Sequence, residues 1–375
     1  MTIPKTMQCV LLTGHGGLEK LKVVNDRPVP VPGDGEVLIK VSAAGINNTD
    51  INTRIGWYSK SVTSGTADGA TAGIEQIDED DASWSGAALS FPRIQGADAC
   101  GVIVAIGAGV PEGRIGERVL VRALQPQPLD ERGVSCITFG SEVDGGFAEY
   151  AVAKSDMTVR VDSDLSDVEL ASFPCAYSTA ENMLHRIGLN SGETVLVTGA
   201  SGGVGSAAVQ LAKRRGAHVI AVASPSKHDF VASLGADAML DRDADYGETP
   251  GEMAVDVVVD LVAGERWPAL IRCIKRGGRY ITAGAIGGPI TEIDIRTLYL
   301  HDLTLAGSTY QPMEVFEHLV GYIERKEIRP VVSKVYPFSQ IAEAQTDFIA
   351  KRYPGKLVLV PDRLFKQEDS EWGRT

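Results

Sequence analysis

A cluster of glycines between residues 194 and 213 carries the plainest chemical signal in the sequence. The segment reads TVLVTGASGGVGSAAVQLAK, in which a β-branched apolar run leads into glycines and then into a helical pattern. At such a turn the backbone N–H groups of a helix N-terminus point toward an anion, and the helix dipole favours a pyrophosphate there. A second β-branched run, His218 to Ala223, follows, as a βαβ unit requires. We therefore predict a dinucleotide site formed by Gly199, Gly202, Gly203, Val204 and Gly205.

The residues after this second run bear on which nicotinamide dinucleotide is bound. An NAD site usually has Asp or Glu at the end of the second strand, where it accepts hydrogen bonds from the ribose 2′-hydroxyl. Here Ser224 and Lys227 take that place, and the first acid is Asp229. A hydroxyl and a cation suit a 2′-phosphate and favour NADP(H), but Ser224 before Pro225 is also a good helix N-cap. Arg242, after the third strand, is either a second cation for the phosphate or a surface residue paired with its acidic neighbours.

The strands that position these residues follow two different patterns along the chain. In the first part, short strands such as Glu36 to Val41 alternate with Gly and Pro turns, as in an antiparallel β domain. From about Asp167 strands alternate with helices, which predicts a doubly wound parallel sheet. A last apolar strand, Lys356 to Val360, completes the first domain, and the acid-containing segment 59–90 looks loose. We expect a first domain over residues 1–160, a second over 161–307, a return to the first over 308–361 and a polar tail over 362–375.

Composition excludes several classes of protein. The chain has 375 residues and a formal net charge of -13, which argues against a nucleic-acid or anionic-membrane surface. No apolar run approaches the ~18 residues of a membrane span, and the N-terminus does not resemble a secretory signal, so we expect a cytoplasmic protein. The five cysteines are scattered and odd in number, as expected of reduced thiols, and we predict no disulfide.

Longer motifs resemble those of the medium-chain dehydrogenase/reductase superfamily, closest to its zinc-free quinone oxidoreductase branch. They include GEVLIKVSAAGINNTDI, GADACGVIVAIGAGV, DGGFAEYAV, FPCAYSTAENML, the glycine turn and GKLVLV, so the resemblance runs from Met7 to Val360. It implies an α/β protein, with a groES-like β domain for the substrate and a Rossmann doubly wound parallel sheet for the cofactor. It also implies a homodimer through the edge of that sheet. Segment 59–90 departs from the family, in which fewer residues follow the R-x-G-x-Y element, here Arg54 to Tyr58.

The same resemblance bears on a catalytic metal. Zinc-dependent relatives bind zinc through a cysteine, a histidine and a second cysteine, and the matching positions here hold Asn47, Ala97 and Cys175. A catalytic zinc needs three N, S or O donors from side chains that suit it, and only Cys175 is of that kind. We therefore expect no catalytic zinc, and no structural zinc because the remaining cysteines are isolated. Cys175 is then interpreted as a packed thiol rather than a reactive one.

Without zinc as a Lewis acid, hydride addition to a quinone or an activated C=C demands less of the protein than reduction of an isolated carbonyl. The protein must still donate hydrogen bonds to the oxygen on which charge develops. The resemblance implies that Asn47 and Tyr58 face nicotinamide and substrate, that Asp50 orients its neighbours and that Thr179 lies beside the nicotinamide amide. Plainer interpretations are a turn-forming Asn, a half-buried aromatic ring and a helix-capping Thr. Asn52 replaces a tyrosine of one subgroup, which leaves substrate preference open.

These features predict an NADPH-dependent oxidoreductase that acts on a small-molecule quinone or α,β-unsaturated carbonyl. One alternative is an alcohol dehydrogenase-type carbonyl reductase that has kept the fold, which the missing zinc ligands disfavour. The other is a non-catalytic NADPH-binding sensor whose acidic insertion recruits a protein, for which the sequence offers no positive signal.

Overall fold

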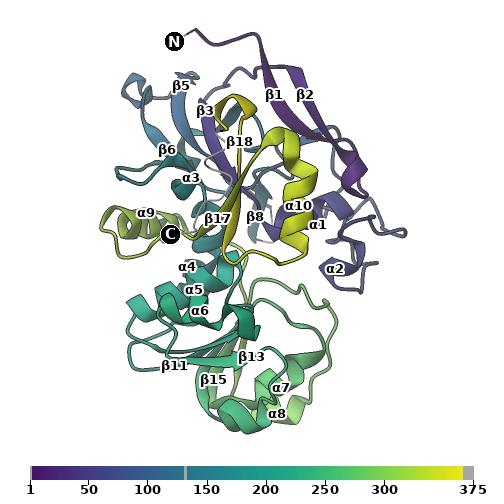
Figure 1. The fold of residues 1–375 in the computed structure, drawn as a ribbon, viewed down its shortest axis with the longest axis vertical. Helices are drawn as coiled ribbons and strands as arrows, with labels where there is room; N and C mark the ends of the chain where they lie inside the picture. Colours follow the sequence, from purple (N-terminus) through teal and green to yellow (C-terminus); the bar gives the residue numbers. More distant parts are fainter. Residues whose placement is uncertain (1, 131–132, 366–375) are drawn as a thin grey trace. The chain divides into compact units, whose positions relative to one another are not determined.

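A computed structural model describes residues 2–130 and 133–365, which fold as two compact units (Figure 1). The described residues of the first unit are 2–62, 68–130, 133–175 and 316–365, and the second unit contains Thr63–Ala67 and Ala176–Val315. The part of the predicted tail after residue 365 lies outside the described residues. The first unit is therefore assembled from segments at both ends of the chain.

A seven-stranded sheet forms the centre of the first unit. Six of its strands follow one another in the order β10 (Thr158–Arg160), β6 (Arg118–Val121), β5 (Cys100–Ile106), β3 (Glu36–Gly45), β18 (Lys356–Val360) and β17 (Val332–Pro337), and β9 (Tyr150–Lys154) also pairs with β3. β18 runs antiparallel to β3, with Val358 opposite Gly45. This pairing brings Lys356, from the far end of the chain, next to the end of β3.

Smaller elements complete the first unit. A three-stranded sheet joins β2 (Leu21–Pro28), β1 (Thr6–Leu12) and β4 (Arg93–Ile94), and β7 (Leu124–Asp130) pairs with β8 (Gly133–Thr138). The helices are α1 (Asn48–Ile55), α3 (Asp167–Leu170), α10 (Ile341–Ile349) and most of α9 (Met313–Glu324).

Segment 59–90 makes defined contacts in the structure. It contains the short helix α2 (Thr66–Gly69), and the side chains of Val62, Ala70 and Ala82 are buried. The guanidinium of Arg54 donates to the carbonyl of Ala70 at 2.5 Å and to the carbonyl of Gly16 at 2.9 Å. The first residue of the R-x-G-x-Y element therefore anchors this segment to the body of the first unit.

The second unit is a six-stranded parallel sheet with helices, which confirms the predicted Rossmann-like fold class. Its strands are β13 (Ala238–Asp241), β12 (His218–Ala223), β11 (Thr194–Val197), β14 (Val255–Asp260), β15 (Ile274–Thr282) and β16 (Thr304–Gly307), in that order. Its helices are α4 (Pro174–Ile187, from its third residue), α5 (Gly203–Arg214), α6 (His228–Ser233), α7 (Trp267–Arg272) and α8 (Ile295–Leu300). The order reverses at β11, and right-handed crossovers then place α5 and α6 on one face and α7 and α8 on the other.

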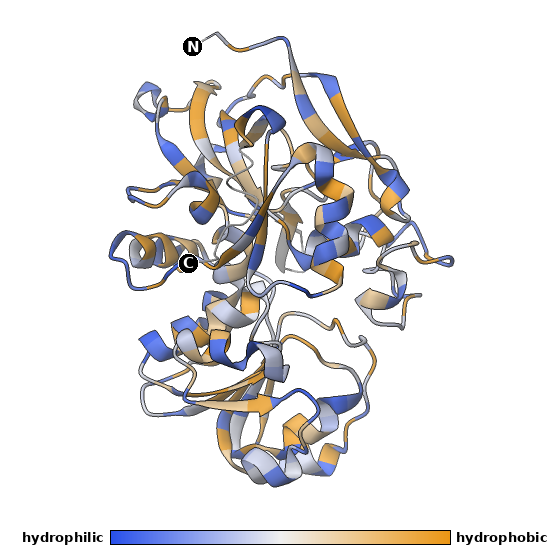
Figure 2. Cartoon of the chain, in the orientation of Figure 1, coloured by the Kyte–Doolittle hydropathy of each residue, from blue (hydrophilic) through white to orange (hydrophobic). Residues whose placement is uncertain are grey.

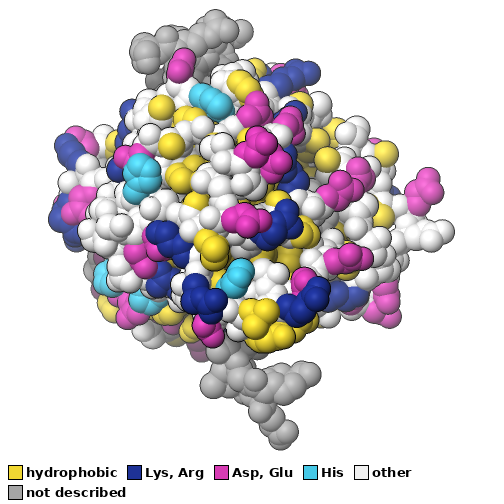
Figure 3. Space-filling view, turned by 90° about the horizontal axis from the view of Figure 1, so that it is seen from below, with side chains coloured by type: hydrophobic (Ala, Val, Ile, Leu, Met, Phe, Trp, Pro, Cys, Tyr) yellow, Lys and Arg dark blue, Asp and Glu magenta, His cyan; other side chains and the backbone are white. Residues whose placement is uncertain are grey.

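Hydropathy explains why these elements pack as they do. β11, β12 and β14 are β-branched and buried almost throughout, as strands covered on both faces must be. Figure 2 shows hydrophobic residues along the strands and hydrophilic residues on the outer sides of helices. On the face in Figure 3, basic side chains lie next to acidic ones, with hydrophobic side chains between them. All five cysteines, each within the described residues, are free thiols. In residues 2–130 and 133–365 we find no helix long and apolar enough to cross a bilayer.

Candidate active site and cofactor site

The glycine turn of the second unit has the geometry of a phosphate-binding turn. β11 ends at Val197, and α5 begins after Gly202, which has an extended backbone at the N-cap position. Gly199 has a φ of +58°, and a Cβ on Gly205 would lie 2.1 Å from the carbonyl oxygen of Gly199. Only glycine permits that approach, so the strand can turn directly into the helix. Gly203 and Val204, the first two residues of α5, are partly exposed while Gly205 is buried, and a helix N-terminus of this kind favours an anion.

The other wall of this candidate cofactor site lies at the ends of β12 and β13. Ser224 is the N-cap of a short 3-10 helix that starts at Pro225, but its side chain makes no capping hydrogen bond. Burial, and then the positive charge of Arg242, lower the pKa of the half-buried Lys227. Arg242 is exposed and also pairs with Asp243 at 3.6 Å. This group thus contains two cations whose like charges repel each other. The contact with a 2′-phosphate predicted for Ser224, Lys227 and Arg242 stays a prediction.

Thr179 lies inside α4, well after its start at Pro174, and its side chain is half-buried. The helix-capping interpretation of this residue is therefore wrong, because a cap must precede the first turn. In the same helix, Asn182 is buried and donates from its side chain to the hydroxyl of Ser308 at 2.9 Å. The nicotinamide contact predicted for Thr179 stays a prediction.

Asp50 joins Asn47 to the loop that precedes β5. Asn47 is the N-cap of α1, and its backbone N–H donates to Asp50 Oδ2 at 2.7 Å, while the N–H of Ala97 donates to Asp50 Oδ1 at 3.2 Å. This is one half of a capping box, and it fixes the first turn of α1. Burial raises the pKa of Asp50 to about 7, with the carboxylate of Asp98 adding to the effect and the N–H of Asn47 opposing it. The carboxylate of Asp50 thus holds two backbone N–H groups, and the orienting role predicted for it stays a prediction.

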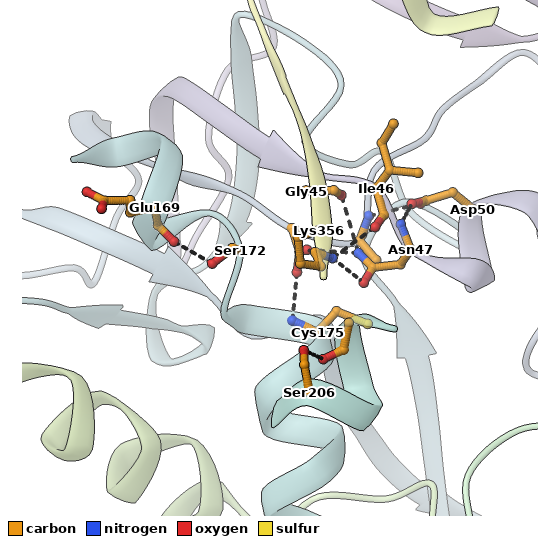
Figure 4. A network of polar contacts seen from close by, with 12 residues as sticks. Gly45, Ile46, Asn47, Asp50, Glu169, Ser172, Cys175, Ser206 and Lys356 are labelled. Carbon is orange, nitrogen blue, oxygen red and sulfur yellow. Dashed lines mark hydrogen bonds and ion pairs between the residues drawn. The ribbon is translucent and has the colours of Figure 1, made fainter. Parts of the chain in front are cut away.

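A buried ion pair lies beside Asn47 (Figure 4). The ammonium of Lys356 donates to Asp98 Oδ2 at 2.9 Å, to Asn47 Oδ1 at 2.6 Å and to the carbonyl of Ile46 at 2.9 Å. Lys356 is 2% exposed and Asp98 is fully buried. The second oxygen of Asp98 accepts the backbone N–H of Cys175 at 2.6 Å. Each of these groups has the partners that a buried charge needs.

The side-chain amide of Asn47 is fully engaged in this network. Its Nδ2 donates to Asp98 Oδ2 at 2.8 Å and to the carbonyl of Gly45 at 3.3 Å, and its Oδ1 accepts from Lys356. An amide has two N–H donors, so neither is left for a substrate oxygen in this arrangement. The oxyanion contact predicted for Asn47 therefore requires the weaker bond, to Gly45, to open.

Whereas the side-chain amide of Asn47 is bonded to the buried ion pair, the hydroxyl of Tyr58 contacts helix α1. It donates to Thr49 Oγ1 at 2.9 Å, and Thr49 lies in the first turn of α1. Burial raises the pKa of Tyr58, hydrogen bonding with Thr49 and Asn52 lowers it by less, and the resulting pKa lies well above the usual value. The phenol therefore remains protonated near neutral pH and is a hydrogen-bond donor. Because a hydroxyl rotates, either Tyr58 or Thr49 can redirect its proton to an incoming oxygen.

The positions that match zinc ligands hold different groups here. Asn47 is bonded to Lys356, Ala97 is buried without a donor side chain, and Cys175 is half-buried. In the part of the chain that the structure describes, no three His, Cys, Asp or Glu side chains are grouped to hold a metal ion. A positive charge nevertheless lies beside these positions, because the ammonium of Lys356 donates to the side chains of Asn47 and of Asp98, the residue after Ala97.

Comparison with known proteins agrees with this fold. Two family models match: the alcohol dehydrogenase GroES-like domain over residues 33–163 and the zinc-binding dehydrogenase over residues 203–325. The quinone oxidoreductase of Rattus norvegicus is 28% identical over 370 residues, which cover 95% of this chain and 98% of that protein. The chloroplastic NADPH-dependent alkenal/one oxidoreductase of Arabidopsis thaliana is 28% identical over 364 residues, 96% of this chain and 81% of that protein.

A solved structure is more similar in sequence. It is a crystal structure described as a "putative alcohol dehydrogenase" from Sinorhizobium meliloti 1021, with 47% identity, a TM-score of 0.84 and coverage of 96% of this chain and 98% of that one. The fold and these similarities thus define an oxidoreductase with a nicotinamide-binding Rossmann unit. The chain belongs to the medium-chain dehydrogenase/reductase superfamily.

Three residues of this region were not predicted from the sequence as site residues: Thr49, Asp98 and Lys356. Lys356 and Asp98 are 258 positions apart, and only the pairing of β18 with β3 brings them together. The available signals were a lysine at the head of an otherwise apolar strand and an aspartate within a glycine-rich turn. A charge in such a place usually has a buried partner, which is the argument that would have found the pair.

Proposed function

We propose that this protein is an NADPH-dependent reductase of quinones or α,β-unsaturated carbonyls that works without catalytic zinc. The observation that carries the proposal is the set of residues at the three zinc-ligand positions: an amide, Asn47, an alanine, Ala97, and only one thiol, Cys175, where a catalytic zinc would need three suitable ligands. The amide is in addition bonded to the ammonium of Lys356. The names of the quinone and alkenal/one oxidoreductases to which the chain is similar support the same reaction class.

When bound, NADPH supplies a hydride to the acceptor. We assign its pyrophosphate to the turn of Gly199, Gly202 and Gly205, and its 2′-phosphate to the group of Ser224, Lys227 and Arg242. NADP is preferred to NAD in this proposal because no carboxylate ends β12, where a ribose 2′-hydroxyl would need an acceptor.

The remaining task of the chain's own residues is to stabilise negative charge on the acceptor oxygen. The hydroxyl groups of Tyr58 and Thr49 can donate hydrogen bonds to that oxygen in place of a metal ion, and the raised pKa of Tyr58 keeps its phenol protonated. Neutral donors are adequate for an enolate or hydroquinone oxygen, whose charge is spread by conjugation, but are a weak substitute for zinc at an isolated carbonyl. Asp50 and Asn47 hold the start of α1, on which Thr49 lies.

The experiment that tests this function is a panel of hydride acceptors: simple enones, a benzoquinone, and saturated aldehydes and ketones of the same size. We expect turnover of the first two classes with NADPH, no loss of rate with a strong chelator, and no stoichiometric zinc by metal analysis. One zinc bound per chain together with chelator-sensitive reduction of saturated carbonyls would support the alcohol dehydrogenase alternative. NADPH binding without turnover of any acceptor would support the sensor alternative.

We further propose a cytoplasmic homodimer that associates through the edge of the Rossmann sheet. Free thiols suit a reducing compartment. In the described part of that sheet β16 pairs with β15 alone, and nearby α8 exposes the apolar side chains of Ile295, Tyr299 and Leu300. Light scattering on the purified protein measures the mass, and a monomer at micromolar concentration would contradict this assembly.

A further inference from the structure

Each of the three N–H donors of the buried Lys356 ammonium already has an acceptor within the protein. An ammonium has three donors, and here all three are accepted, by Asp98 Oδ2, Asn47 Oδ1 and the carbonyl of Ile46. At 2% exposure it also has no route to donate to water. Lys356 therefore does not transfer a proton to the substrate in this arrangement, and its role must be exercised through the groups it holds.

Those groups belong to four segments that are distant in sequence. Lys356 begins β18, Ile46 and Asn47 follow β3, Asp98 precedes β5, and the N–H of Cys175 in α4 donates to the other oxygen of Asp98. The packing around the pair is close: a Cβ on Gly45 would lie 2.5 Å from Asp98 Oδ2 and 2.9 Å from Lys356 Cε. Figure 4 shows Lys356 between Asn47 on one side and Cys175 on the other.

We propose that Lys356 is a positioning residue for the reductase reaction: its ammonium holds the Asn47 side chain, and so fixes the start of helix α1 that carries Thr49. The expected effect of Lys356 on turnover rests on the proposed function, whereas its effect on the position of α1 does not. The path has two steps. Lys356 and Asp98 lock the amide of Asn47, and the backbone N–H of Asn47, bonded to Asp50, then sets where the first turn of α1 begins. Thr49, in that turn, accepts the hydrogen bond of Tyr58.

A role in overall stability alone does not explain the arrangement. A buried ion pair costs desolvation energy, and replacing both partners by uncharged side chains of similar size is often neutral or stabilising. What an apolar pair cannot do is donate to Asn47 Oδ1 and so fix which way the amide faces. A positioning role thus predicts that replacing both Lys356 and Asp98 restores the thermal stability but leaves kcat low.

The test uses the full chain with Lys356→Met, the double variant Lys356→Met/Asp98→Leu, and Lys154→Met as a matched control. Lys154 also pairs with an acid, Glu36, in the same unit, but is 53% exposed. We expect kcat for cyclohexenone or benzoquinone to fall on the order of ten- to a hundredfold in both Lys356 variants, as for a displaced catalytic group. The thermal midpoint should recover in the double variant, the Kd for NADPH should stay within twofold of wild type, and Lys154→Met should match wild type throughout.

Hydrogen–deuterium exchange gives a readout that does not depend on turnover. Amides of residues 48–55 should exchange at least threefold faster in both Lys356 variants, while those of β11 and α5 in the second unit stay unchanged. Unchanged exchange over residues 48–55 overturns the proposal even if no acceptor is ever found, so its failure is distinct from that of the proposed function. Recovery of kcat in the double variant also overturns it, because Lys356 would then serve only to balance the charge of Asp98.

Discussion

Removing the two cations at the ends of β12 and β13 should weaken NADPH binding to different and calculable extents. A charge-assisted hydrogen bond is worth about 1.5 to 3 kcal/mol, and one decade in Kd corresponds to about 1.4 kcal/mol. Lys227 is half-buried, so Lys227→Ala should raise the Kd for NADPH by about tenfold to 150-fold. The side chain of Arg242 is 71% exposed. At that exposure a pair contributes about 0.5 to 1 kcal/mol, and Arg242→Ala should cost about two- to fivefold.

The pKa of Lys227 adds a second consequence. Because Arg242 contributes to lowering that pKa, the two cations repel each other when no phosphate lies between them. Removing Arg242 should therefore raise the pKa of Lys227. In the double variant Lys227→Ala/Arg242→Ala the loss should differ from the sum of the two single losses, since the residues share one phosphate.

The assay is a fluorescence titration of the reduced nicotinamide, carried out with NADPH and with NADH on each variant. NADH lacks the 2′-phosphate, so its Kd should change less than twofold. Arg296→Ala is the matched control, because Arg296 is 73% exposed, lies in the same unit and pairs with Asp294. Equal losses for NADH and NADPH would refute the reasoning and point to a general disturbance of the turn after β12. An unchanged Kd for both would place the 2′-phosphate elsewhere.

Three further substitutions test other parts of the site. Tyr58→Phe keeps the ring and removes the donor, so kcat should fall by up to about 10²-fold while the Kd for NADPH is unchanged; a wild-type rate of single-turnover hydride transfer would make Tyr58 a packing residue. Gly205→Ala sets a Cβ 2.1 Å from the carbonyl of Gly199, so titration should show at least a tenfold loss of NADPH affinity. The pKa of Asp50 is raised to about 7, so wild type loses folding stability as pH rises from about 4 to 7. Asp50→Asn should lack this loss, which unfolding curves at pH 5 and pH 8 would reveal.

The second unit was predictable because its signals are local. The glycine turn, the strand before it and the helix after it lie within 20 consecutive residues, and β12 has the bounds that its β-branched run predicts. The apolar pattern from Arg279 to Ala283 predicts one further strand of this sheet, and the strand found there, β15, runs from Ile274 to Thr282. The early part of that strand reads IKRGG, and only its Ile274 pairs with β14, opposite Val255, before the register shifts and Arg279 pairs with Val257. Its charges and glycines carry no strand pattern, so a single pairing before a register shift could not be predicted from the sequence.

The candidate active site was harder to predict because its contacts join distant segments. Asn47, Tyr58 and Asp50 were proposed from the resemblance, but the sequence does not reveal that both amide hydrogens of Asn47 are already bonded. That fact depends on Lys356 and Asp98, which meet only when β18 has paired with β3. Segment 59–90 was interpreted as loose from its composition, yet a guanidinium on a helix before it fixes one of its carbonyls. Composition counts polar residues but does not show which of them find partners.

Because both side-chain N–H groups of Asn47 are already hydrogen-bonded, hydroxyl groups must stabilise the negative charge that develops on the acceptor oxygen. With the ammonium of Lys356 and the N–H of Cys175 both directed at Asp98, the strongest donors near Asn47 point into the protein. Thr49 and Tyr58 remain, and neither carries a formal charge. Neutral donors stabilise a developing negative charge less than a cation or a metal ion does. Such a site is therefore best suited to acceptors that delocalise the charge by conjugation, because these need the least stabilisation of the transition state from the protein. The same groups that make Asn47 a poor direct donor are thus the reason to expect enones and quinones to be reduced faster than saturated carbonyls of equal size.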